Sequence, residues 1–263
     1  QTGESNVSVG ENSMYYNTGS YNVAVGRQAL LSNTTADNNI AIGYKAAYTN
    51  STGLGNTVVG SEALELGTSS YNTALGYKAL EVSTTGQNTA VGSYALYGNT
   101  TGTSNVAIGG FSDSIFPALN ANTTGSYNVA IGTGALQDNT TASNNTAVGY
   151  ASLYSNITGT GNTAVGRFSG YNIKGNNNVT LGGRAAYLLN KTAGATVGNV
   201  AVGESAMILQ NNTTGDIEYN TIVGSDAGRA YNITTGAFKN NAVLGYNAMD
   251  GFNMTTGGLQ QNV

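Results

Sequence analysis

Apolar and polar positions alternate in a short block that recurs throughout the chain. In Asn22-Val23-Ala24-Val25-Gly26, an Asn precedes an aliphatic residue, a small residue, a second aliphatic residue and a Gly. Val, Ile and Thr dominate the middle positions of the block, as is typical of a β-strand, and Gly closes the run. Each block therefore predicts one short strand.

The block occurs in 14 complete copies, from Asn6–Gly10 to Asn241–Gly245. Successive block glycines are mostly 16 or 17 residues apart, with longer units at 110–132 and 183–245. Such a period is typical of a solenoid, in which each coil is stabilised by its neighbours. No linker or shift in composition interrupts the series. We therefore expect one all-β repeat domain over 1–263, a parallel β-solenoid (β-roll) of about 14 coils.

A second segment follows each block Gly and has the form x-x-Ala-Leu or a relative, as in Tyr77-Lys78-Ala79-Leu80. Asn, Thr or Gly follows within a few residues, so a helix of ordinary length has no room there. We expect a single turn or a second strand. A turn rich in Asn, Thr and Gly, such as Asn99-Thr100-Thr101-Gly102, then reverses the chain. Two short strands and two turns would make one coil.

The two faces of the predicted strand differ in residue size. The fourth block position is always Val, Ile or Leu, and we assign it to the core together with the second position. The third position lies on the opposite face and is Ala in nine of the 14 copies. A persistent small residue suggests that another chain approaches closely. We therefore expect a subunit interface there, which Ala107→Glu would disrupt, whereas Asn99→Ala in a turn would be tolerated.

The recurring Asn and Gly are assigned structural roles. An Asn at one place in every coil suits an internal amide ladder, and the Gly suits a corner with positive φ or a close approach. The ladder hypothesis includes Asn22, Gly26, Asn39, Gly43, Asn88, Gly92, Asn105, Gly109, Asn145 and Gly149.

The turns also contain Asn-x-Ser/Thr sequences. In a eukaryotic secretory route these would be glycosylation sites on the outer rim, and otherwise they are plain turn chemistry. The candidate sites include Asn33, Asn99, Asn122, Asn139 and Asn212.

The amino-acid composition excludes several classes of function for this protein. The chain has no His and no Cys, which excludes zinc sites of the Cys/His kind and nucleophiles activated by His, and we expect no cofactor. Only 8% of residues are charged and the net charge is -4, so no basic patch for nucleic acid is expected. Gly or Asn interrupts every apolar stretch, so we expect no membrane insertion. A hydrophobic content of 40% favours a buried core over disorder.

Two kinds of side chain are candidates for chemistry or binding. Asp216 and Glu218 are the nearest pair of carboxylates for a glycosidase, but no partner base or Arg cluster accompanies them, so a solvated loop is the favoured interpretation. The 17 Tyr recur near the turns and suit half-buried rims, either as a packing ladder or for stacking on carbohydrate. We expect no enzymatic activity.

The repeated motifs of the chain resemble those of two families of surface protein. Asn105–Gly109 and Asn128–Gly132 resemble the head repeats of trimeric autotransporter adhesins, and Asn88–Leu96 resembles the repeat region of phage tail fibre proteins. The resemblance covers essentially the whole chain. It implies a left-handed parallel β-roll with three chains around one axis, that is, a homotrimer. The unit is longer than adhesin head coils usually are, which would make the Asn-Thr-Thr-Gly turns extra outer loops.

These observations predict a non-enzymatic, extracellular fibre segment at a virion or cell surface, presenting or contributing to host-surface attachment. Its expected partners are itself, as a homotrimer or filament, and a cell-surface glycan or receptor. A bacterial trimeric adhesin head, a self-assembling extracellular filament subunit and a β-helical polysaccharide depolymerase stay open as alternatives. A fifteenth block stops at Asn262-Val263 and no polar capping repeat is seen, so we expect a piece of a longer fibre.

Overall fold

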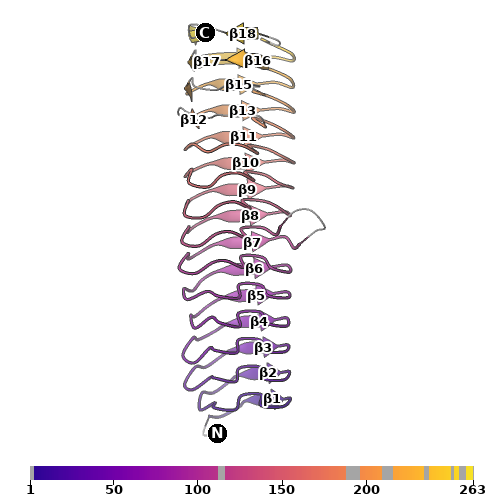
Figure 1. The fold of residues 1–263 in the computed structure, drawn as a ribbon, viewed down its shortest axis with the longest axis vertical. Helices are drawn as coiled ribbons and strands as arrows, with labels where there is room; N and C mark the ends of the chain where they lie inside the picture. Colours follow the sequence, from indigo (N-terminus) through magenta and orange to yellow (C-terminus); the bar gives the residue numbers. More distant parts are fainter. Residues whose placement is uncertain are drawn as a thin grey trace. The chain divides into compact units, whose positions relative to one another are not determined.

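The fold was obtained as a computed structural model, which describes residues 3–111, 116–187, 196–208, 216–233, 237–249, 252–254 and 259–262. The chain forms two compact units, Gln1–Thr133 and Gly134–Val263, and each is considered by itself. Within each unit, short parallel strands follow one another coil by coil (Figure 1). No helix occurs among the described residues. The prediction of an all-β parallel solenoid is confirmed.

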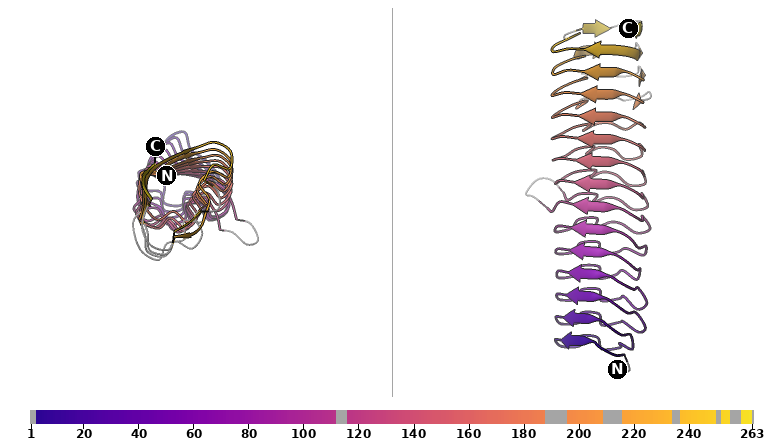
Figure 2. Two further views of the ribbon diagram at one scale, coloured as in Figure 1. Left: turned by 90° about the horizontal axis from the view of Figure 1, so that it is seen from above. Right: turned by 180° about the vertical axis from the view of Figure 1, so that it is seen from behind.

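In the first unit each coil contributes one strand of three residues. These strands are β1 (Val7–Val9), β2 (Val23–Val25), β3 (Ile40–Ile42), β4 (Thr57–Val59), β5 (Thr73–Leu75), β6 (Thr89–Val91), β7 (Val106–Ile108) and β8 (Val129–Ile131). Each strand pairs in parallel with the next at the equivalent block position, as Ala24 does with Ala41. Differences in repeat length are therefore taken up in the turns, and the strands stay on one side of the unit (Figure 2).

The second unit repeats this arrangement and adds short strands. Its block strands are β9 (Thr146–Val148), β10 (Thr163–Val165), β11 (Val179–Leu181), β13 (Val200–Val202), β15 (Thr221–Val223) and the end of β17 (Phe238–Leu244). The added strands are β12 (Thr196–Val197), β14 (Ile217–Glu218), β16 (Ala230–Ile233), β18 (Phe252–Met254) and β19 (Leu259–Asn262). β12, β14 and the start of β17 pair in parallel as a second ladder. A second strand thus occurs in the longer C-terminal units, whereas the 16- and 17-residue units have a turn in its place.

The strand faces are the reverse of the sequence prediction. The block Ala residues point into their own coil, and Ala41 and Ala107 are 0% exposed. The second and fourth positions point outward, so that Ile40 is 40% exposed and Ile42 is 39% exposed. The coil interior is narrow because the x-x-Ala-Leu segment and Asn side chains fill it from the other sides, and a small residue stands opposite them in most coils, while Val58 and Ile222 occupy the same buried position in theirs. The assignment of the second and fourth positions to the core was wrong, as was that of the Ala face to a subunit interface.

The outward second and fourth residues of β1 to β8 form two rows, which we call the strand face. It contains Val, Ile, Leu and Thr and no charged residue. Every one of these side chains is half-buried or exposed.

The x-x-Ala-Leu segment is a turn that brings its last two residues inward. Ala29 and Leu30 are both 0% exposed. Three non-glycine residues in a typical coil have a left-handed backbone, for example Asn38 at φ 61°, Lys45 at φ 52° and Ala47 at φ 51°. This conformation is costly for L-residues. It is supported by bonds to the next coil, such as that from the Ala47 N–H to the Ala63 carbonyl oxygen at 3.0 Å.

The block Gly forms the corner between strand and turn. Gly43 has φ 138°, and a Cβ there would overlap the carbonyl oxygen of Gly60 in the next coil. Both the backbone conformation and the close approach of two coils therefore require Gly at this position. Gly26, Gly92, Gly109 and Gly149 have the same left-handed corner geometry.

Candidate functional site

The Asn of each block lies inside its coil and joins it to the next coil. Asn39 is 0% exposed, and its backbone N–H donates to Asn22 Oδ1 at 2.9 Å. Its own Oδ1 accepts the N–H of Asn56 at 2.9 Å, and its Nδ2 donates to the Gly53 carbonyl oxygen at 2.9 Å. In the second unit the Asn162 N–H donates to Asn145 Oδ1 at 2.9 Å. These Asn residues thus have structural roles, and their side chains lie away from the surface.

The sequon Asn residues also point inward. Asn33, Asn99, Asn122 and Asn139 are each 0% exposed, and Asn212 lies outside the described residues. Asn99 Nδ2, the atom that would carry a glycan, donates to the Gly102 carbonyl oxygen at 2.9 Å and to Ser83 Oγ at 3.2 Å. A glycan at these four positions is incompatible with this fold. Turn composition alone does not show that Asn99 faces inward, and the expected tolerance of Asn99→Ala stays a prediction.

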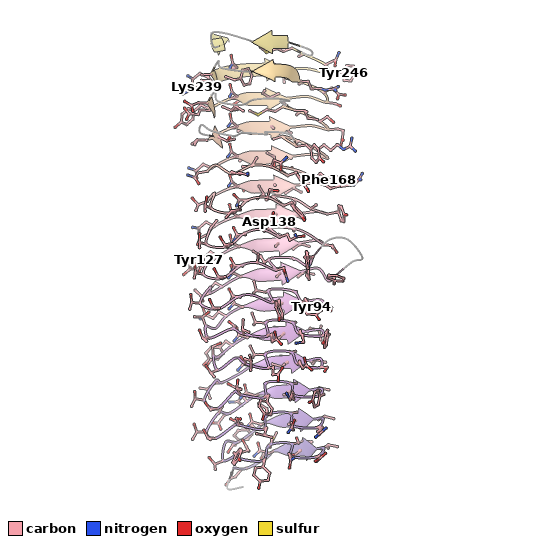
Figure 3. The ribbon with its side chains drawn as sticks, in the orientation of Figure 1. Tyr94, Tyr127, Asp138, Phe168, Lys239 and Tyr246 are labelled. Carbon is pink, nitrogen blue, oxygen red and sulfur yellow. The ribbon has the colours of Figure 1, made fainter. Side chains whose placement is uncertain are left out.

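Asp216 and Glu218 are brought together by Lys239 at the second ladder of the second unit. Lys239 Nζ lies 2.8 Å from Asp216 Oδ2 and 3.0 Å from Glu218 Oε2 (Figure 3). The hydrogen bond to Asp216, followed by that to Glu218, raises the pKa of Lys239 above its usual value. The two carboxylates therefore share a cation in an ion-paired group on and beside β14, instead of lying in a solvated loop.

The corner that follows the block Gly carries aromatic side chains on several coils of the first unit, those that follow Gly43, Gly76, Gly92 and Gly109. We call this column the aromatic edge, and it consists of Tyr44, Tyr48, Tyr77, Tyr94, Tyr97, Phe111 and Phe116. Tyr94 meets Tyr77 and Tyr97 edge-to-face, with ring centroids 5.2 Å and 5.3 Å apart. Phe111 and Phe116 meet in the same way at 5.8 Å. Such contacts are favourable for aromatic pairs and hold the rings in fixed orientations.

Charged side chains are interleaved with these rings. Lys45 Nζ lies 2.9 Å from Glu65, and Lys78 Nζ lies 2.7 Å from Glu81 and 3.0 Å from Glu62. The hydrogen bond to Glu81, followed by that to Glu62, raises the pKa of Lys78 strongly.

One carboxylate oxygen from each of Glu62, Glu65 and Glu81 lies within 4.8 Å of the others. Lys45 and Lys78 supply the countercharge for this group. The three acids are therefore members of an ion-pair network beside the rings, a role that needs no metal ion.

A six-residue extension of one turn opens a pocket on the aromatic edge. Gly109 and Ala118 are nine positions apart, whereas the corresponding Gly92 and Ala95 are three apart. The Ala118 N–H still donates to the Gly109 carbonyl oxygen at 3.2 Å, as the Ala95 N–H does to Gly92 at 3.1 Å. The coil therefore closes normally, and the two ends of the extension place Phe111 and Phe116 outside it.

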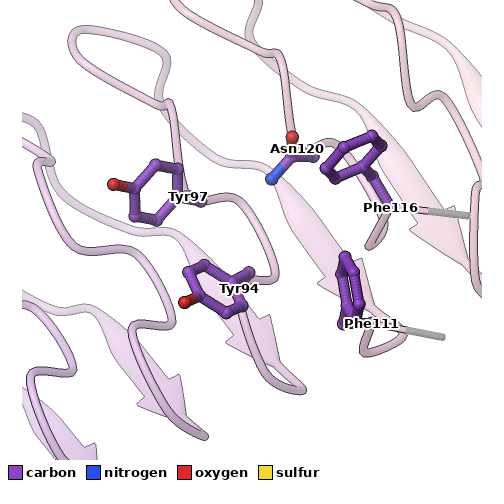
Figure 4. A pocket seen from close by; sticks show the side chains of 5 residues that line it. All are labelled: Tyr94, Tyr97, Phe111, Phe116 and Asn120. Carbon is purple, nitrogen blue, oxygen red and sulfur yellow. The ribbon is translucent and has the colours of Figure 1, made fainter. Parts of the chain in front are cut away.

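The pocket is lined by Tyr94, Tyr97, Phe111, Phe116 and Asn120, and its volume is about 410 Å³ (Figure 4). The two Phe residues are 53% and 52% exposed. Sequence reasoning did not find this pocket. The available signal was that two of the five Phe in the chain stand within a single lengthened repeat.

The second unit has an aromatic cluster of its own, formed by Tyr150, Tyr154, Phe168, Tyr171 and Tyr187. Tyr154 and Tyr171 stack face to face, with centroids 4.9 Å apart and planes 10° apart. Burial, as the main cause, raises the pKa of Tyr171. One pair of this cluster is thus stacked as in a packing ladder, whereas Phe168 meets Tyr150, Tyr171 and Tyr187 edge-to-face.

No protein-family model matches the chain, and comparisons with curated proteins and with solved structures gave no match. Among the residues that the structure describes, no helix has the length and apolar character needed to cross a membrane.

Proposed function

We propose that the chain is a structural segment of an extracellular fibre, at a virion or cell surface, that contributes to attachment. The observation that supports this most is the exact repetition of the strand pairing and of the buried Asn bond from coil to coil. Coils paired in this way lie about 4.8 Å apart and hold equivalent outward positions in columns. Weak binding groups in such columns act together on a ligand that itself repeats.

The strand face supports self-association. It replaces the Ala face as the proposed subunit interface. Its two rows carry aliphatic side chains and Thr without charge, and large continuous apolar surfaces of this kind mark interaction sites. Three copies that turn their strand faces toward a common axis would bury these rows in a closed assembly. The proposed assembly is therefore a homotrimer.

Sedimentation of the purified chain at micromolar concentration tests the assembly. We expect three times the mass of one chain, and a single-chain mass for the double variant Val106→Glu with Ile108→Glu, which places two carboxylates on the strand face. Thr101→Glu is the matched control, because Thr101 is exposed in a turn away from that face. A monomeric wild-type chain, or a trimer that survives the double substitution, would overturn the proposed interface.

The fibre proposal is also tested against the depolymerase alternative. Asp216 and Glu218 both form an ion pair with Lys239, an arrangement that differs from the acid and base carboxyl pair of a glycosidase. We expect surface polysaccharides incubated with the chain to keep their size distribution in size-exclusion chromatography. A fall in polymer size that Glu218→Gln abolishes would replace the structural role by an enzymatic one.

A further inference from the structure

We propose that the pocket formed by Tyr94, Tyr97, Phe111, Phe116 and Asn120 binds a neutral pyranose unit of a surface polysaccharide. This inference deepens the attachment role proposed above and rests on it. It assigns a ligand class to one place on the aromatic edge.

The shape and chemistry of the pocket suit a sugar ring. A volume of about 410 Å³ lies in the range of small-molecule sites, which combine apolar walls with a few polar groups. Tyr94 and Tyr97 lie on one side, Phe111 and Phe116 lie on the other, and Asn120 lies at one end (Figure 4). Aromatic faces carry negative charge density that attracts the C–H groups of a pyranose, and the Asn120 amide offers both a donor and an acceptor to ring hydroxyls.

Phe111 and Phe116 of this pocket are partly accessible to a ligand. Phe111 and Phe116 meet at an interplanar angle of 74°, and about half of each side chain is exposed. Tyr154 and Tyr171 instead lie at 10° and cover each other's faces. The two ends of the lengthened turn therefore present partly exposed apolar rings, as expected of a binding site.

The charges beside the pocket favour a neutral ligand. Glu81 is the main cause that raises the pKa of Tyr97, a lining residue, and it belongs to the network of three Glu and two Lys described above. That network carries one excess negative charge, which repels sulfated and carboxylated sugars. Its carboxylates are also good acceptors for the hydroxyls of neighbouring sugar units.

The test measures binding to an array of neutral glucose, galactose and mannose oligosaccharides and of sulfated oligosaccharides. We expect the wild-type chain to bind neutral members, and Tyr94→Ala and Phe116→Ala each to weaken that binding about tenfold or more. Tyr150→Ala is the matched control, because Tyr150 follows a block Gly as Tyr77 does but lies in the second unit, outside the set of residues that line the pocket. Circular dichroism checks that each variant folds.

Three results would overturn the proposal: no neutral oligosaccharide is bound, only sulfated ones are bound, or binding persists in both pocket variants. Self-association is measured separately, so the two proposals fail in different ways. A monomeric chain that binds the sugars and loses this binding in Tyr94→Ala would contradict the fibre proposal and support the pocket proposal. A trimeric chain that binds no sugar would contradict the pocket proposal and support the fibre proposal.

Discussion

The side-chain oxygen of Asn88 accepts the backbone N–H of Asn105, one coil further along the chain, at 3.0 Å. Asn105 does the same for Asn128, also at 3.0 Å, while its Nδ2 donates to the Gly125 carbonyl oxygen at 2.8 Å. The separation along the chain is 17 residues in the first case and 23 in the second. The same bond thus forms across repeats of different length, because added residues leave the coil at a turn.

Replacing Asn105 by Ala should destabilise the chain. The substitution leaves the buried N–H of Asn128 without its acceptor, at about 1–3 kcal/mol, and removes one of the two amide donors to the Gly125 carbonyl oxygen, which keeps Asn122 Nδ2 at 3.0 Å. We expect the free energy of unfolding, measured by urea denaturation, to fall by about 2 kcal/mol or more. Thr101→Ala, at an exposed turn position, should change it by less than about 0.5 kcal/mol. Equal effects of the two substitutions would contradict the ladder's energetic role.

Enlarging the block Ala should also destabilise the chain. Ala107 is 0% exposed and faces the filled interior of its coil, so Ala107→Leu overpacks it, at a cost of about 1–3 kcal/mol. Ile108→Leu changes the outward neighbour on the same strand and should stay within about 0.5 kcal/mol. Thermal and urea unfolding of both variants check this ranking. The opposite ranking would restore the strand orientation that the sequence first suggested.

Asp138 should make stability depend on pH. Burial is the main cause that raises the pKa of Asp138 above its ordinary value, although the Gln137 amide and the charge of Lys174 act against it (Figure 3). The folded chain then holds this proton more tightly than the unfolded chain. The stability that the protonated Asp138 carboxyl contributes is fully present below the ordinary Asp pKa. It is lost as the pH rises through the raised pKa of Asp138 in the folded chain.

Asp138→Asn removes the loss of stability that accompanies ionisation of Asp138 at rising pH, because Asn cannot ionise. The variant should have the higher melting temperature at pH 7, and the difference should vanish near pH 3. Melting temperatures of both chains across that pH range provide the measurement. A difference that is unchanged between the two pH values, or a wild type that is more stable at pH 7, would refute the assigned cause.

The period and residue types of the block were sufficient to predict the parallel stack, the buried Asn and the Gly corner. They were not sufficient to orient the strand. Val and Ile transfer from water more favourably than Ala, so hydrophobicity alone placed Ile40 and Ile42 inside. The interior instead selects for size, because Leu30 and Asn33 of the same coil already fill it from the other sides.

Two further features depend on information that a repeat pattern does not contain. Leu30 occupies φ 47°, a conformation that is uncommon for a bulky residue, so no residue preference indicates the turn it forms. The pocket joins Tyr94 and Tyr97 to Phe116 and Asn120 of the following coil. Their proximity follows from the stacking of coils and from the length of one turn, and it becomes visible once the register is known.

The left-handed residues of each coil bear on how the chain folds. Lys45 and Ala47 each carry roughly 1–2 kcal/mol of backbone strain, and bonds from the adjoining coil help to offset it. A first coil has no such neighbour and is therefore a costly nucleus, whereas every later coil grows on a finished template. Folding within a unit should therefore begin slowly and then propagate quickly from coil to coil.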